Sequence, residues 1–115
     1  MSAILVLEPD PEIRTLYERA ITRLGHRPAF AEDGVVELGD VDVVLVEPGS
    51  PRDLDIAQTL RAERPALPIV CASIYPANGF GLGPVAFLEK PFRLSALEHA
   101  IGCALTAREP SVRSA

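Results

Sequence analysis

The sequence has no tryptophan, one methionine, two cysteines and no long hydrophobic run. No apolar stretch approaches the roughly 20 residues of a transmembrane helix, so no membrane association is expected. Lysine and arginine total 11 against 16 aspartates and glutamates, giving a net charge of −5, and this acidic balance argues against binding to nucleic acid. A glycine-rich phosphate loop, a zinc-ligand spacing and a nucleophilic triad are also missing, so the sequence does not predict an enzyme.

The two cysteines, Cys71 and Cys103, lie in apolar segments and lack metal-ligand spacing. We expect both to be reduced and buried, in a cytoplasmic protein.

No basic stretch precedes the apolar run at residues 4–7, which therefore predicts a strand rather than a signal peptide. A length of 115 residues suits one domain, predicted at residues 1–107. Residues 108–115 show no periodicity and are expected to form a flexible C-terminal tail.

The first helix has the clearest sequence signature. Asp10 is a suitable N-cap, Pro11 suits the first helical position, and Glu12 favours the positive end of the helix dipole. Gly25 is a typical C-terminal stop. The spacing of apolar residues predicts one buried face, made of Ile13, Leu16, Tyr17, Ala20, Ile21 and Leu24.

Apolar runs alternate with helical patterns along the chain. The run at 41–46 is rich in valine and ends at Glu47, which is typical of a central strand in a parallel sheet. The run at 26–31 contains Pro28 and should lie at a sheet edge. The alternation predicts a flavodoxin-like (βα)5 three-layer α/β sandwich with a parallel five-stranded sheet of order 2-1-3-4-5.

Two of the connecting helices are expected to be small. Only residues 35–39 remain for a helix before the central strand. The segment 75–84 has three glycines and two prolines, so its helix should be reduced or missing. In the predicted order, the carboxyl ends of four strands would bring together Glu8, Glu47, Ser73 and Lys90.

Several segments agree in order and chemistry with one known family. They are Ile-Leu-Val-Leu-Glu-Pro-Asp-Pro-Glu-Ile-Arg at 4–14, Ala-Glu-Asp-Gly at 31–34, Asp-Val-Val-Leu-Val-Glu-Pro-Gly-Ser-Pro at 42–51, Leu-Pro-Ile-Val at 67–70 and Phe-Leu-Glu-Lys-Pro-Phe at 87–92. With them, the chain resembles the receiver domain of bacterial two-component response regulators over nearly its whole length. In that family an aspartate ending the third strand accepts a phosphoryl group from a histidine kinase, and an acidic pair helps it to hold Mg²⁺.

The resemblance assigns roles to individual positions. Glu47 occupies the phosphoacceptor position, and Glu8 and Pro9 occupy the acidic pair, with Asp10 beside them. The positions of the phosphoryl-binding hydroxyl, the aromatic switch and the phosphoryl-binding lysine with its proline are Ser73, Phe87, Lys90 and Pro91. Phe87 could equally be a fixed core residue, because it has no hydroxyl to expose.

The sequence departs from the family pattern at the positions that would bind Mg²⁺ and accept the phosphoryl group. Pro9 has no carboxylate, Asp10 is committed to capping a helix, and Glu47 is one methylene longer than aspartate. Mg²⁺ needs oxygen ligands in near-octahedral array, and phosphoryl transfer depends on positioning. We therefore expect a degenerate pseudo-receiver that is not phosphorylated and has no cofactor. Protein partners are expected: a histidine kinase or another regulator, with a homodimer also possible.

Several alternatives stay open at this level. Glu47 could mimic the phosphorylated state by reaching Lys90 and Ser73, or the site could simply have decayed. A working phosphoacceptor would need Mg²⁺, for which Glu8 and Glu47 are weak candidate ligands. A flavodoxin-like domain could instead bind a small anionic ligand at the same strand ends.

Overall fold

The computed structural model describes residues 2–31, 41–75, 79 and 81–113, with the side chains of 108–113 not described. Its five strands form one parallel sheet in the order β2-β1-β3-β4-β5. The elements in chain order are β1 (Ala3–Leu7), α1 (Pro11–Arg23), β2 (Arg27–Phe30), β3 (Val43–Val46), α2 (Pro51–Glu63), β4 (Ile69–Ser73), β5 (Ala86–Glu89) and α3 (Leu94–Arg113). The predicted fold class and strand order are confirmed.

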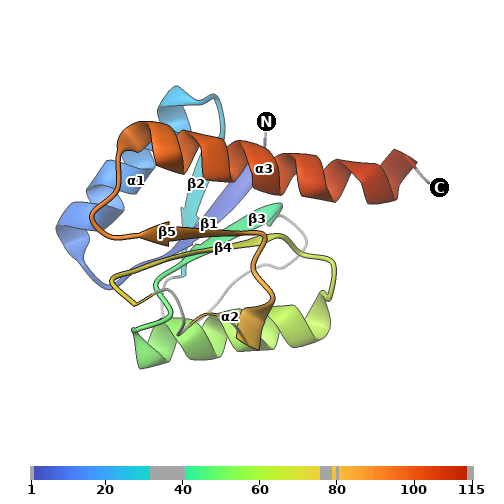
Figure 1. Cartoon of the computed structure of the whole chain (residues 1–115), viewed down its shortest axis with the longest axis horizontal. Coiled ribbons are helices and arrows are strands. Elements are labelled where there is room, and N and C mark those ends of the chain that lie inside the picture. The colour runs from blue at the N-terminus through green and yellow to red at the C-terminus, as the bar shows by residue number, and fades with distance from the viewer. Residues whose placement is uncertain (1, 32–40, 76–78, 80, 114–115) are drawn as a thin grey trace.

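Helices cover both faces of the sheet, which gives three layers. In Figure 1, α1 and α3 lie on one face and α2 lies on the other. Successive side chains of a strand point to opposite faces, so Ile4 joins the core under α1 and α3 while Leu5 joins the core over α2. All residues of β1, β3 and β4 are buried. This double burial explains why these runs are continuously apolar.

The start of α1 is formed as predicted. Asp10 accepts a hydrogen bond on Oδ1 from the Glu12 N–H at 2.9 Å, and Pro11 occupies the first helical turn. Gly25 follows the helix with a φ of +86°, a conformation that glycine adopts without strain. Leu16 was expected in the buried face, and this is wrong because the residue is 49% exposed.

Where the structure describes the connections between strands, they agree with the expectation of small helices. β2 lies at the edge of the sheet, as Pro28 predicted. Between β4 and β5 the described residues form only a short 3₁₀ turn around Gly81 and Leu82, so the helix there is reduced. The predicted short helix at 35–39 lies outside the described residues.

The last helix is longer than predicted. It buries Leu97, Ala100, Ile101 and Ala104 against the sheet and continues to Arg113. The helix therefore includes residues 108–113, which were expected to belong to the tail, and the flexibility expected of that tail stays a prediction. Helical residues without an apolar stripe give no periodic signal in the sequence, which is why the boundary was placed too early. No helix in the described part is both long and apolar enough to cross a bilayer.

The two cysteines differ in environment. Both are free thiols, but only Cys71 is buried, so the expectation of a buried Cys103 is wrong. Burial, followed by the charge of Glu47, raises the pKa of the Cys71 thiol to about 11. Because the thiolate is the reactive form, Cys71 should be inert in the folded protein.

This difference gives a simple prediction. Iodoacetamide should modify the native chain at Cys103 alone, and the denatured chain at both cysteines. Peptide mapping after brief labelling at pH 8 shows which cysteine has been modified. Labelling of Cys71 at a comparable rate in the native protein would show that the core over α2 opens readily.

Candidate functional site

The register of the sheet brings two glutamates together at its carboxyl edge. Leu7 of β1 pairs with Val46 of β3. The residues that directly follow these two are Glu8 and Glu47, which therefore lie side by side. On the other side of β3, Ser73 ends β4 and pairs with Glu89 of β5, immediately before Lys90. The predicted convergence of these strand ends is therefore present.

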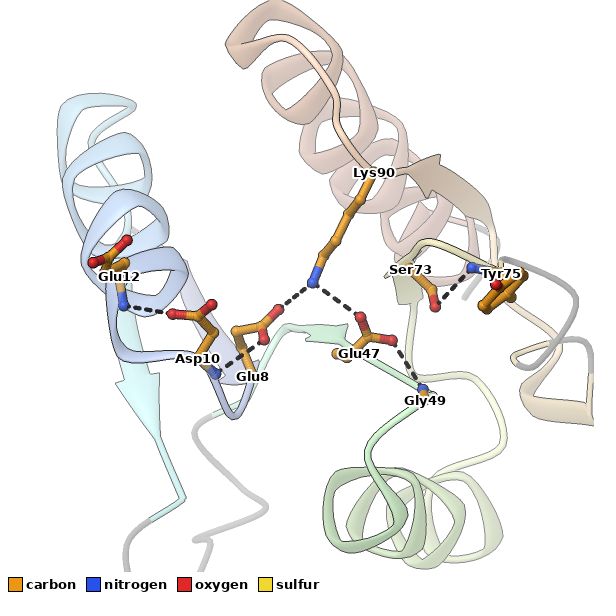
Figure 2. A network of polar contacts seen from close by, with 8 residues as sticks. All are labelled: Glu8, Asp10, Glu12, Glu47, Gly49, Ser73, Tyr75 and Lys90. Carbon is orange, nitrogen blue, oxygen red and sulfur yellow. Dashed lines mark hydrogen bonds and ion pairs between the residues drawn. The ribbon is translucent and has the colours of Figure 1, made fainter.

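Lys90 bridges the two glutamates. Its Nζ donates to Glu8 Oε1 at 2.6 Å and to Glu47 Oε1 at 3.0 Å, as Figure 2 shows. The three side chains, called here the Lys90 clasp, are 3% (Glu8), 14% (Glu47) and 13% (Lys90) exposed. Lys90 is also the only lysine of the chain. One cation thus neutralises one of two largely buried negative charges.

The outer oxygens of both carboxylates are also engaged. Glu8 Oε2 accepts from the Asp10 N–H at 3.1 Å, and Glu47 Oε2 accepts from the Gly49 N–H at 2.9 Å. Hydrogen bonds to an ionised carboxylate are stronger than neutral ones. All four oxygens of the clasp therefore have a donor within the protein.

These contacts set the protonation of the clasp. Burial alone would raise the pKa of Glu47, but hydrogen bonds from Gly49, Lys90 and Ser73, with the charge of Lys90, outweigh it and lower that pKa below 4.5. Burial alone would lower the pKa of Lys90, but the two glutamates outweigh it and raise that pKa above 10.5. Glu47 and Lys90 are consequently both ionised at neutral pH.

The clasp does not fit the Mg²⁺ ion of the family. Mg²⁺ requires near-octahedral oxygen ligands, yet every clasp oxygen already accepts a hydrogen bond and an ammonium lies between the carboxylates. Pro9 offers no carboxylate, and the Asp10 side chain caps α1. Across the part of the chain that the structure describes, no group of three or more His, Cys, Asp or Glu residues is placed to hold a metal ion.

The remaining predicted site residues fall into two groups. Ser73 is buried at the end of β4, where its hydroxyl hydrogen bonds to Glu47 and accepts from the Tyr75 N–H at 3.2 Å. Pro91 follows Lys90 through a cis peptide bond. Phe87 lies on β5 but is 39% exposed, so the reading of it as a fixed core residue is wrong.

One contact of the clasp and one of its neighbours were not expected from the sequence. The bridge from Lys90 to Glu8 was missed, because residue spacing does not show how far a lysine reaches. Tyr17 was expected only as core, but its hydroxyl is buried without a hydrogen-bond partner among the described residues. Burial, then the charges of Glu8 and Glu47, raise its pKa. The Tyr17 ring stacks on the Phe92 ring with the two ring centroids 6.2 Å apart. Tyr17 therefore packs against the segment that follows Lys90.

Sequence comparison finds distant relatives of known type. No family model matches the chain. The DNA-binding transcriptional regulator NtrC of Rhizobium meliloti (strain 1021) is 28% identical over 96% of this chain, and NtrC of Azospirillum brasilense is 29% identical over 95%. The chain spans about a quarter of the length of these curated relatives.

Comparison with solved structures finds the same architecture. A CheY-like receiver domain from Methanospirillum hungatei JF-1 has a TM-score of 0.82 at 16% identity, covering 96% of this chain and 98% of that one. The HemR receiver domain of Leptospira biflexa has a TM-score of 0.80 at 19% identity, covering 92% and 95%. NtrX from Brucella abortus has a TM-score of 0.82 at 22% identity, covering 98% and 29%. The chain has the fold of response-regulator receiver domains, as its sequence motifs suggested.

Proposed function

We propose that this chain is a pseudo-receiver: a protein–protein interaction module of bacterial two-component signalling that acts without phosphorylation. One observation carries the proposal. The ammonium of Lys90 is held between Glu8 and Glu47, within hydrogen-bond distance of both. In this fold that is where an acidic pair and an acceptor carboxylate would hold Mg²⁺ and a phosphoryl group.

The clasp opposes phosphorylation in two ways. A carboxylate must be free and aligned to attack phosphorus, and a misplacement of 1 Å can cost roughly 100-fold in rate. Glu47 instead has both oxygens engaged, and its longer side chain already contacts Lys90 and Ser73. These are the groups that would bind phosphoryl oxygens in the family. Glu47 therefore acts as a fixed negative charge in place of the transient charge that a phosphoryl group would bring.

A protein partner is the proposed ligand, namely a histidine kinase or another regulator in the cytoplasm. Next to the clasp is an apolar hollow of about 560 Å³. Its lining includes Leu16 and Ile74, which are 49% and 62% exposed. Exposed apolar side chains gathered in one hollow are typical of surfaces that contact other proteins. The NtrC relatives are named as DNA-binding, but the net charge of −5 disfavours DNA contact by this segment.

The proposal predicts no phosphorylation by a small-molecule donor. Incubation with acetyl phosphate and Mg²⁺ should leave the intact mass unchanged, because no free acceptor carboxylate lies beside a metal site. Mass spectrometry measures this directly. A gain of one phosphoryl group at Glu47 or a neighbouring aspartate would instead establish a working, Mg²⁺-dependent acceptor and overturn the proposal.

A further inference from the structure

A second pair of reactive side chains lies on the outer face of α3. His99 and Cys103 are four residues apart, so they are neighbours one turn apart on the helix, and both are exposed. The Nε2 atom of His99 is 3.5 Å from the Sγ atom of Cys103. Both residues line an open hollow, with the polar side chains of Ser95, Glu98 and Thr106 among its lining.

The spacing of the two ligand atoms matches one class of ion. Zinc binds cysteine sulfur at about 2.3 Å and histidine nitrogen at about 2.0–2.1 Å, with tetrahedral geometry. Those two bonds at a tetrahedral angle place sulfur and nitrogen about 3.5 Å apart. The observed separation between Cys103 Sγ and His99 Nε2 is the same, 3.5 Å. The separation of the two atoms, which are in hydrogen-bond contact, is therefore compatible with both binding one such ion.

We propose that His99 and Cys103 form a two-ligand site for Zn²⁺ or a chemically similar divalent transition-metal ion. The Cys103 thiol would release its proton to solvent and bind as the thiolate, and His99 would bind through its neutral Nε2. Water would complete the tetrahedral set. With two protein ligands instead of four, the site should bind more weakly than a structural zinc site.

The chain supplies its own matched controls. Its other cysteine, Cys71, is buried in the core over α2, and its other histidine, His26, accepts from the Ser2 N–H on Nδ1 at 3.4 Å. Neither lines the hollow on α3. Substituting them removes the same chemical groups without touching the proposed site.

The test is a titration of the full chain with Co²⁺, which substitutes for Zn²⁺ and absorbs light when bound to a thiolate. A non-thiol reductant keeps Cys103 reduced. We expect a thiolate-to-cobalt band that excess Zn²⁺ abolishes. Cys103→Ser should remove the band, and His99→Gln should weaken apparent affinity at least about tenfold, as expected when one of two ligands is lost. His26→Gln and Cys71→Ala should bind as the unmodified chain does.

Two results would overturn the proposal. The first is the absence of a band from the folded, reduced chain. The second is a band that survives His99→Gln with unchanged affinity, because the thiol alone would then account for binding. Circular dichroism of each variant shows whether α3 is intact, and a Zn²⁺-dependent rise in melting temperature that both substitutions abolish provides an independent readout.

Discussion

Replacing Lys90 with methionine is expected to lower the free energy of unfolding by roughly 3 kcal/mol at pH 7. Methionine keeps an unbranched side chain, one atom shorter than that of lysine, but leaves Glu8 and Glu47 as adjacent carboxylates without a cation. Glu8 is 3% exposed and Glu47 is 14% exposed, so water can replace only part of the lost interaction. The expected loss is at the low end of the range for breaking a buried ion pair because Glu47 is not fully buried.

The loss should shrink as the pH falls. In the unmodified chain the pKa of Glu47 is lowered, so its contribution is present above pH 4.5 and disappears as the pH falls through its folded pKa. The pKa of Lys90 is raised, so its contribution is present below pH 10.5 and disappears above its folded pKa. Without Lys90, a clasp carboxyl is easier to protonate when folded than when unfolded, and acid stabilises the variant relative to the unmodified chain.

Urea unfolding at pH 7 and pH 5 measures both effects. The matched control is Arg19→Met, which removes an exposed cation from α1 and should cost about 1 kcal/mol or less. Adding Glu8→Gln to Lys90→Met should recover part of the stability, because one stranded charge is then removed. A loss below about 1 kcal/mol for Lys90→Met, equal to that of the control, would mean that the clasp behaves as a solvated surface pair.

The fold could be predicted because its signals are local and redundant. Strands buried on both faces must be apolar throughout, which is what the runs around Leu5, Val44 and Val70 show. Pro28 marked the edge strand, and Asp10 with Pro11 marked the start of α1. The parallel order then followed from alternation and from the right-handed rule for crossovers.

The errors concern exposure and element ends, which depend on what packs nearby. Leu16 fits the helical period of α1 but lies at the border of its buried stripe, in the lining of an apolar hollow. Cys103 lies in an apolar segment of α3 but faces away from the sheet. A window of apolar residues cannot distinguish the two faces of a helix at its margins.

The site was predictable in its members but not in its contacts. Strand ends brought Glu8, Glu47, Ser73 and Lys90 together because parallel strands share a carboxyl edge. That Lys90 contacts both glutamates depends on side-chain reach across three strands, which no spacing of residues along the chain encodes.

The double substitution Pro9→Asp with Glu47→Asp is expected to convert the chain from one that gains no phosphate to one that gains a single phosphoryl group. The new aspartate at position 9 would supply the missing carboxylate of the acidic pair. The shorter side chain at position 47 would withdraw the acceptor carboxylate by about one bond length, away from Lys90 and Ser73. Those two groups would then be available to phosphoryl oxygens, and Mg²⁺ would gain ligands that the native chain lacks.

Acetyl phosphate with Mg²⁺ and intact mass spectrometry measure the gain. In the reaction a carboxylate oxygen of the aspartate introduced at position 47 attacks phosphorus and acetate leaves. Pro9→Asp with Glu47→Asn is the matched control, because an amide has no carboxylate oxygen to attack phosphorus. Glu47→Asp alone should react more slowly than the double variant, since one metal ligand is still missing. If the folded double variant gains no mass, the defect lies beyond these two positions, and the residues at 9 and 47 do not by themselves explain why the native site would be silent.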